Sequence, residues 1–302
     1  MSIKEQADGA EPPRPGEDAA LTPKSASRVL LVEDNRVSQQ VAKAVLEQCG
    51  LQVDVVDNGQ KAVAAMTEQQ YHLIFMDCQM PVMDGYQATQ TIRALEAETG
   101  SLSPIPIIAL TASDLQEDGD KCLEAGMDDF LSKPFSRKQA AKILARWLSL
   151  TVAGKETVSG GKFLDREDPG ADPGALIAPM ETQPSLLDRE VLRSIRDLQK
   201  NGGSGFLGKV IDCYLNDSAR LMAQLLDALE NGDAHSAHRA AHSLKASTAQ
   251  IGASGLASLY KEIEQLTLSP NLPEMDGILR QATTAYARVR EALIAERERI
   301  AK

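Results

Sequence analysis

Residues 28–150 alternate short apolar runs with segments of helical periodicity, and this alternation constrains the fold more than any other feature of the sequence. Each apolar run is short enough to be one buried strand. The runs are RVLLVE, QVDVV, HLIFMD, PIIAL and DFLS, and helical patterns follow them at residues 36–49, 58–69, 86–98, 115–125 and 136–150. This alternation predicts an α/β domain in which helices cover both faces of a parallel sheet.

Residues 186–302 show no strand signal and predict an antiparallel helical bundle. The stretch LLDREVLRSIRDLQK predicts a first helix. One face of a long second helix is marked by Leu207, Val210, Ile211, Tyr214, Ser218, Leu221 and Leu225. Asn231-Gly232-Asp233 predicts a turn in which Asp233 caps a third helix, and two more helices are expected near 255–267 and 274–299. The chain is therefore expected to be α/β plus all-α.

Two stretches interrupt this pattern. Residues 1–27 are rich in Pro, Gly, Ala and charge, and predict a disordered tail. Residues 151–185 contain Gly160-Gly161, Pro169-Gly170 and Pro173-Gly174 and predict a flexible linker. We therefore expect a first domain over 28–150 and a second over 186–302.

Charge and cysteine usage narrow the functional class. The net charge of −11 argues against nucleic acid as the main partner, because a phosphate backbone requires basic surfaces. The widely spaced cysteines fit a reduced, intracellular setting; they are Cys49, Cys78, Cys122 and Cys213. The N-terminus lacks the apolar core of a signal peptide, and LIFM and IIAL are too short to span a bilayer. We expect a cytoplasmic protein without a membrane segment.

Carboxylates gather at the predicted strand ends. Glu33 and Asp34 follow the first strand, and Asp77 ends the third. Three carboxylates at one rim raise one another's pKa values, and a Mg²⁺ ion relieves this conflict. Thr111 ends the fourth strand and Lys133 follows the fifth, so a hydroxyl and an ammonium join the carboxylates. This set suits phosphoryl transfer, where positioning and charge neutralisation dominate.

Two other interpretations compete with phosphoryl transfer at this rim. The residues can be ordinary polar strand ends, although five of them in this order make that interpretation weak. An aspartyl-phosphate hydrolase needs a D-x-D pair, and MDCQM has no second carboxylate at that spacing.

The motifs VEDN, MDCQMPVMDG, LTA and KPF, in this order, make residues 28–150 similar to a response-regulator receiver domain. The resemblance implies a flavodoxin-like, doubly wound, five-stranded parallel sheet. It implies that Asp77 is the phosphoacceptor and that Thr111 and Lys133 contact the phosphoryl group. It also implies a Mg²⁺ site, whose ligands are Glu33, Asp34, Asp77 and the backbone carbonyl of Gln79.

The same resemblance assigns further positions. Phe130 matches an aromatic switch position, and the Lys133–Pro134 peptide is expected to be cis. Gln79 and Ser113 occupy positions that tune dephosphorylation in receivers, so the lifetime of the phosphoryl group stays open.

Three of the chain's four histidines lie within His235–His242. His235, His238 and His242 fall on one face of a helix. The stripe can chelate a metal such as Zn²⁺, act as a pH switch, form an ordinary solvated face, or carry one reactive imidazole. Lys245 favours His242 as that imidazole, because a cation one turn away stabilises a phosphorylated ring and no Asp or Glu lies in this turn.

AAHSLKASTAQIGA resembles the motif of histidine phosphotransfer (HPt) domains, which are four-helix bundles. The resemblance implies that His242 carries a phosphoryl group and that Lys245 stabilises it. His235 and His238 become bystanders. Ala246 departs from the glycine common at its position, which bears on which receivers dock there.

GSGFLG, at residues 203–208, matches the dinucleotide-binding pattern G-x-G-x-x-G. In a dinucleotide-binding site that pattern lies between a strand and a helix, whereas this segment follows a helical stretch. We expect an interhelical loop.

A receiver followed by an HPt domain implies a phosphorelay intermediate. A histidine kinase would phosphorylate Asp77, and the group would pass through His242 to another response regulator. No ATP-binding kinase signature is recognised, so a phosphotransfer protein rather than an ATP-dependent enzyme is expected. The alternatives are a phosphate sink that runs in reverse, the C-terminal part of a hybrid sensor kinase, and a phosphorylation-gated adaptor.

Overall fold

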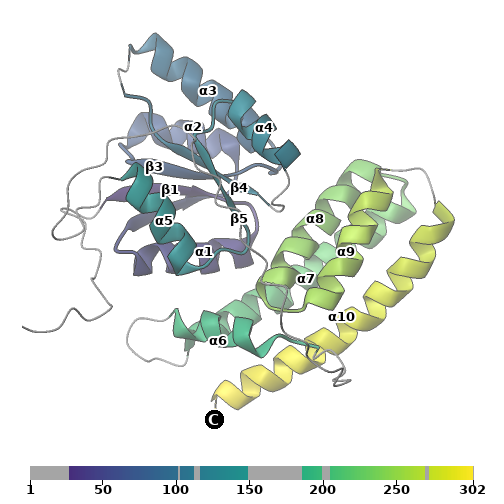
Figure 1. The fold of residues 1–302 in the computed structure, drawn as a ribbon. Coiled ribbons are helices and arrows are strands. Elements are labelled where there is room, and N and C mark those ends of the chain that lie inside the picture. The colour runs from purple at the N-terminus through teal and green to yellow at the C-terminus, as the bar shows by residue number, and fades with distance from the viewer. Residues whose placement is uncertain are drawn as a thin grey trace, which may run out of the picture.

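The computed structural model describes residues 27–100, 103–111, 116–148, 186–198, 205–268 and 272–301. Within these ranges the chain forms an α/β domain and a helical domain, which lie side by side (Figure 1). The predicted linker at 151–185 and the predicted tail, apart from Ser27, lie outside the described residues. None of the described helices combines the length and the apolarity needed to cross a membrane.

The first domain contains a five-stranded, all-parallel sheet in the order β2-β1-β3-β4-β5. The strands are β1 (Arg28–Val32), β2 (Gln52–Val56), β3 (Leu73–Asp77), β4 (Ile107–Thr111) and β5 (Asp129–Ser132). Each coincides with one of the predicted apolar runs. The order is that of the flavodoxin-like fold, in which ligands bind beyond the carboxyl ends of β1 and β3. The predicted fold class is confirmed.

Helices cover both faces of this sheet, as expected. They are α1 (Arg36–Gln48), α2 (Gly59–Glu68), α3 (Gly85–Glu98), α4 (Gln116–Glu124) and α5 (Arg137–Trp147). Because successive strand side chains point to opposite faces, Val29 and Leu31 of β1 join the core beneath α1 and α5. Leu30 and Val32 join the core on the α2, α3 and α4 side.

Gly85 explains how α3 can begin directly against the end of β3. A Cβ atom at this position would lie 2.1 Å from the carbonyl oxygen of Asp77, so only glycine fits. The preceding residue, Asp84, caps α3 by accepting a hydrogen bond from the backbone N–H of Gln87 at 2.8 Å. The sequence MDG therefore holds the loop after Asp77 close to the carboxyl edge of the sheet.

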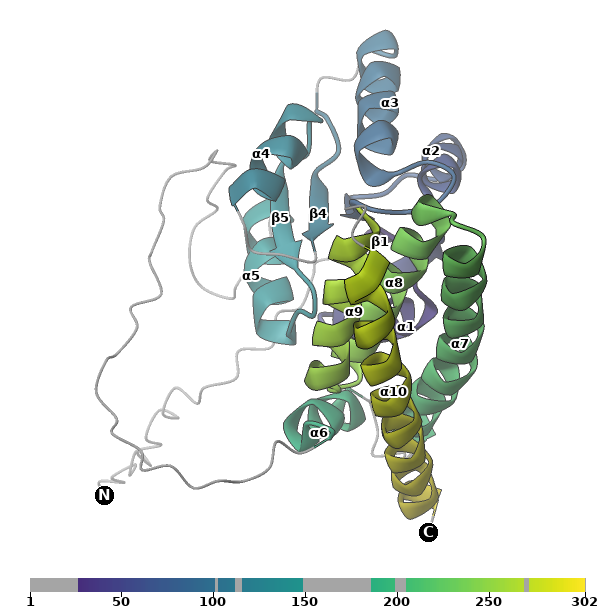
Figure 2. The same ribbon diagram turned by 90° about the vertical axis from the view of Figure 1, so that its right-hand side faces the viewer.

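The second domain is helical throughout the described residues. Its helices are α6 (Arg189–Asp197), α7 (Gly205–Glu230), α8 (Ala234–Gln250), α9 (Ser254–Thr267) and α10 (Leu272–Ala301). Figure 2 shows α7 to α10 running alongside one another, with the short α6 at one end of this bundle. Tyr214 and Tyr260 are fully buried in its core. Asp233 caps α8 as predicted, accepting from the Ser236 backbone N–H at 3.0 Å.

The prediction of a loop over residues 203–208 is wrong for residues 205–208. Gly205–Gly208 form the first turn of α7, whereas residues 203–204 lie outside the described residues. Leu207 is 2% exposed, so its burial favours helix formation in this turn. No described strand precedes α7 in this domain, so the structural context of a dinucleotide site is missing from the described residues.

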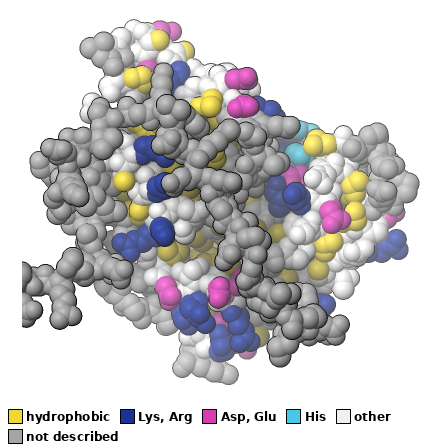
Figure 3. Space-filling view, viewed as in Figure 1, with side chains coloured by type: hydrophobic (Ala, Val, Ile, Leu, Met, Phe, Trp, Pro, Cys, Tyr) yellow, Lys and Arg dark blue, Asp and Glu magenta, His cyan; other side chains and the backbone are white. Residues whose placement is uncertain are grey.

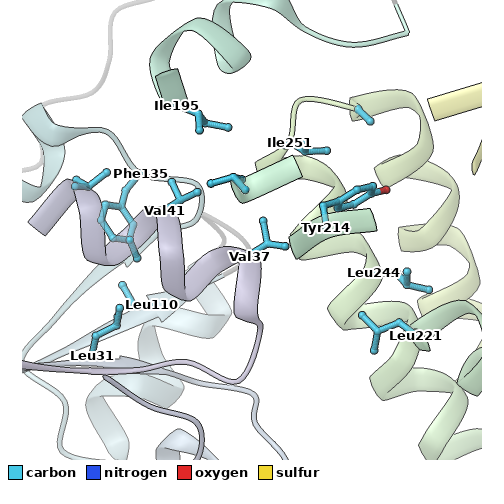
Figure 4. Packing of buried hydrophobic residues seen from close by; sticks show 14 of the residues in the cluster. Leu31, Val37, Val41, Leu110, Phe135, Ile195, Tyr214, Leu221, Leu244 and Ile251 are labelled. Atoms are coloured by element: carbon cyan, nitrogen blue, oxygen red, sulfur yellow. The ribbon is translucent and has the colours of Figure 1, made fainter. Parts of the chain in front are cut away.

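Helix α1 joins the two domains. It contacts α7 and α8, and one core cluster of buried side chains continues from the sheet into the bundle. In Figure 4, Val37 and Val41 project from α1 toward the helices that carry Ile195 and Tyr214. Asn35 and Gln48, at the two ends of α1, donate side-chain hydrogen bonds to the carbonyl oxygens of Ser243 and Asp197, at 2.9 and 3.1 Å. This packing turns the carboxyl edge of the sheet toward α8.

Candidate functional site

The predicted carboxylate cluster forms at the carboxyl edge of the sheet. Glu33 and Asp34 follow β1, Asp77 ends the adjacent β3, and carboxylate oxygens of all three lie within 4.8 Å of one another. Glu33 and Asp77 are only 1% and 3% exposed. Because burial removes water that would screen the charges, this cluster concentrates negative charge in a small space.

Lys133 is the cation that faces this cluster. Its Nζ lies 2.7 Å from Asp77 Oδ2 and 3.0 Å from Glu33 Oε2. Burial acts to lower the pKa of Lys133, but the charges of Asp77 and Glu33 outweigh it and raise that pKa above its usual value. The ammonium group therefore stays charged and holds the two carboxylates in place.

One ammonium does not balance three carboxylates. Burial, with the Asp77 and Asp34 charges, raises the pKa of Glu33 to about 8 against the pull of Lys133. Burial and the charge of Asp77 raise the pKa of Asp34 to about 7. Three oxygen donors with excess negative charge are the donor set that Mg²⁺ prefers, so the residues present fit the predicted ion.

Of the remaining predicted residues of this domain, Thr111 and Gln79 are joined to the cluster by backbone hydrogen bonds. The Lys133 backbone N–H donates to the Thr111 carbonyl oxygen at 2.7 Å, which places the buried Thr111 beside Lys133. The Gln79 backbone N–H donates to Asp77 Oδ1 at 3.2 Å. Phe130, on β5, is 39% exposed. The Lys133–Pro134 peptide is cis, as the resemblance implied, and Ser113 lies outside the described residues.

Glu264 is a site residue that the sequence analysis missed. Its carboxylate reaches across from α9, with Oε1 lying 2.5 Å from His242 Nδ1 and Oε2 lying 2.6 Å from Lys245 Nζ. Burial acts to raise its pKa, but the hydrogen bonds and charges of His242 and Lys245 outweigh this and lower the pKa to about 2. The turn of α8 that carries His242 has no acidic residue, but the neighbouring helix supplies one.

The other histidines of the stripe have different surroundings. His238 Nδ1 lies 3.1 Å from Thr267 Oγ1 and 3.2 Å from the Glu264 carbonyl oxygen, whereas His235 is exposed. Histidine side chains are visible at the boundary between the two domains in Figure 3. Among the described residues, the group with metal-ligand geometry is the carboxylate cluster, and it includes no histidine.

A cleft of about 1150 Å³ lies between the two domains. On the sheet side its lining includes Asp34 and Gln79, and on the bundle side it includes His242 and Ser243. The carboxylate cluster and the histidine that Glu264 contacts therefore open onto the same space.

Two family models match the chain. The response regulator receiver domain matches residues 29–145, and the Hpt domain matches residues 209–292. Both are phosphotransfer signalling domains rather than ATP-dependent kinase domains.

Similar proteins include the sensor protein GacS of Pseudomonas syringae pv. syringae, which is 30% identical over 275 residues, or 87% of this chain and 27% of GacS. The sensor histidine kinase GacS of Pseudomonas protegens is 41% identical over 127 residues, or 42% of this chain and 14% of that protein. The chain thus spans about a quarter or less of the length of these relatives.

Among solved structures, the receiver domain of the sensor histidine kinase PA1611 from Pseudomonas aeruginosa is 47% identical to this chain. The match covers 41% of this chain and 99% of that domain, with a TM-score of 0.38. That structure has a magnesium ion in its active-site cleft. The two family matches, in this order on one chain, show that the protein belongs to the two-component phosphorelay family, with a receiver domain followed by an Hpt domain.

Proposed function

We propose that this chain is a phosphorelay intermediate, in which Asp77 accepts a phosphoryl group and His242 carries it onward. The observation that supports this proposal most is the shared cleft, onto which the rim of the carboxylate cluster and His242 both open. A phosphoryl group held at the carboxylate cluster would therefore face the cleft onto which His242 also opens.

In the first step, an Asp77 carboxylate oxygen attacks the phosphorus of a donor, and the bond from phosphorus to the donor breaks. Lys133, whose Nζ lies 2.7 Å from Asp77 Oδ2, neutralises charge on the incoming oxygens, and the Thr111 hydroxyl donates a hydrogen bond to one of them. Glu33, Asp34, Asp77 and the Gln79 carbonyl would hold Mg²⁺. The ion would supply further charge neutralisation at the phosphoryl oxygens.

In the second step, His242 Nε2 attacks the phosphorus of the Asp77 acyl phosphate. A carboxylate can only accept hydrogen bonds, so the contact with Glu264 places the proton on Nδ1 and leaves the Nε2 lone pair available. The bond from phosphorus to the Asp77 oxygen breaks, and Asp77 returns to its carboxylate form. Lys245, which also contacts Glu264, supplies the cation beside the phosphorylated ring.

Receiver and Hpt domains imply phosphotransfer partners on both sides of this exchange. We propose a histidine kinase as the upstream donor and another response regulator as the downstream acceptor.

The test is to locate the phosphoryl group after incubation with Mg²⁺ and labelled acetyl phosphate, from which acetate leaves. Wild type is compared with Asp77→Ala and His242→Ala, and stability in acid and alkali separates phosphohistidine from acyl phosphate. The proposal predicts alkali-stable label on His242 that disappears in Asp77→Ala. Label confined to Asp77 in the wild type would contradict the internal exchange. An adaptor, unlike a relay, would keep its output in a His242→Gln variant.

A further inference from the structure

We propose that Asn35 is a positioning residue for phosphoryl transfer, which sets the register between the carboxylate cluster and the helix that carries His242. This inference rests on the proposed exchange between Asp77 and His242. Asn35 follows the candidate metal ligand Asp34 in the chain, and Ser243 follows His242. The hydrogen bond from Asn35 Nδ2 to the Ser243 carbonyl oxygen, 2.9 Å long, therefore joins the neighbours of the two reacting sites.

The Asn35 side chain is also held by contacts within its own domain. Its Oδ1 accepts hydrogen bonds from the backbone N–H groups of Val37 and Ser38, both at 3.1 Å, and so caps α1. Because two N–H donors define which side-chain atom is the oxygen, the amide nitrogen must point the other way, toward Ser243. The residue is 6% exposed, so water competes little for this contact.

The backbone of Asn35 adds a link to the carboxylate cluster. Its N–H donates to Glu33 Oε1 at 3.2 Å. One residue thus contacts a candidate metal ligand through its backbone, the first turn of α1 through its side-chain oxygen, and α8 through its side-chain nitrogen. A shift of α1 along α8 would break the last of these contacts and displace the cluster from the histidine.

The second interdomain hydrogen bond, which Gln48 donates, is less suited to holding the carboxylate cluster and α8 in register. Gln48 Nε2 donates to the Asp197 carbonyl oxygen at the far end of α1, and that contact is exposed to solvent. Exposed hydrogen bonds exchange readily with water and add little net free energy. The partly buried contact of Asn35, beside His242, is therefore the one that we expect to control transfer.

Two substitutions can separate the two roles of the Asn35 side chain, which donates to Ser243 and caps α1. Serine caps a helix about as well as asparagine, so Asn35→Ser keeps the cap and removes the amide donor. The Ser243 carbonyl oxygen also accepts from Ser247 Oγ at 2.9 Å, so it keeps a partner in this variant. Asn35→Ala removes both the donor and the cap. Asn58→Ser is a matched control, because Asn58 caps α2 by accepting from the Lys61 N–H and makes no interdomain hydrogen bond among those described.

The experiment follows label from Asp77 to His242 in the full-length chain, with each transfer rate expressed per labelled Asp77, and records the thermal unfolding midpoint. Asn35→Ser is expected to slow transfer by about fivefold, the effect of one hydrogen bond, with only a small fall in the midpoint. Asn35→Ala should slow transfer equally and lower the midpoint further, because the helix cap is also lost. Asn58→Ser should transfer at the wild-type rate.

Two results would overturn the inference while leaving the proposed function intact. Transfer at the wild-type rate in Asn35→Ser would show that the donor does not position the sites. Slow transfer in Asn35→Ala alone would assign the effect to the helix cap. Absence of His242 label in the wild type would instead refute the proposed exchange itself, and the inference with it.

Discussion

The two candidate sites shift the pKa values of their carboxylates in opposite directions. At the sheet edge, three carboxylates share one buried ammonium, and the pKa values of Glu33 and Asp34 rise to about 8 and about 7. In the bundle, one carboxylate lies between an imidazole and an ammonium, and the pKa of Glu264 falls to about 2. The first site has an excess of negative charge that a cation relieves, whereas the second is balanced by its own residues.

The difference shows what each site requires before it can act. Under the proposed function, the carboxylate cluster would need both Lys133 and an added cation to hold a phosphoryl group, which is itself negative. The histidine site would need orientation, which the contact of Glu264 with Nδ1 would provide. The two sites should therefore respond differently to loss of a charge, to Mg²⁺ and to acid.

Loss of Lys133 should have the largest effect. Lys133→Met leaves Asp77 and Glu33 buried without their cation, so we expect the unfolding free energy without Mg²⁺ to fall by about 3 kcal/mol. The rate at which acetyl phosphate labels Asp77 should fall by about a hundredfold. Chemical denaturation and labelling kinetics measure these effects. Lys138→Met, on the exposed surface of α5, is the control, and equal behaviour of the two variants would contradict the role of Lys133.

Mg²⁺ should stabilise the wild type through the carboxylate cluster. A ligand at a hundredfold excess over its Kd adds about 2.7 kcal/mol to the unfolding free energy. Asp34→Asn removes one of the three carboxylates, so most of this gain should disappear. Thermal unfolding across a Mg²⁺ titration measures the gain, with metal-free samples as reference. An undiminished gain in Asp34→Asn would place the ion elsewhere.

Acid should weaken the histidine site. Because the folded-state pKa of Glu264 is depressed, its stabilising contribution is present above its usual value of 4.5 and is lost as the pH falls toward about 2. The difference in unfolding free energy between wild type and Glu264→Gln should be about 2 kcal/mol above that window and should shrink across it. Glu262→Gln, an exposed neighbour on α9, should show no such trend. A difference that grows as the pH falls would contradict the assignment.

Glu264 should also affect transfer. Glu264→Gln removes the charge that fixes the proton on His242 Nδ1, so movement of label from Asp77 to His242 should slow by about tenfold. Single-turnover kinetics measure this rate, and Asp77 labelling by acetyl phosphate serves as the internal reference. Transfer as fast as in Glu262→Gln would mean that orientation by Glu264 is dispensable.

His235 and His238 should have the smallest effects. His235 is exposed, and His238 is held by Thr267 on α9. His235→Ala and His238→Ala should each leave the transfer rate within about twofold of wild type. If either variant loses alkali-stable label altogether, the reactive histidine has been assigned incorrectly.

The sequence predicted the sheet site better than the bundle site, and topology explains why. The carboxyl ends of neighbouring parallel strands meet at one edge, so Glu33, Asp34 and Asp77 could be brought together from their positions after β1 and β3. All five strands, the helices on both faces and the cap at Asp233 followed from periodicity and local signals in the same way.

The contacts of His242 depend on how two helices are rotated against each other, which periodicity alone does not determine. One signal was available for Glu264: it is a charged residue beside Ile263 and four positions after Tyr260, on the buried face of α9. The contact of Asn35 with Ser243 joins residues 208 positions apart and depends on domain packing. No local pattern in either segment predicts it.

The most direct test of the relay follows label from acyl phosphate to phosphohistidine in the wild-type chain over a range of protein concentrations. Exchange between Asp77 and His242 of one chain predicts a first-order rate constant that does not change with concentration. A mixture of Asp77→Ala and His242→Gln chains reports transfer between chains and should be slower at low concentration. A wild-type rate that rises in proportion to concentration, or an absence of label on His242, would contradict the account.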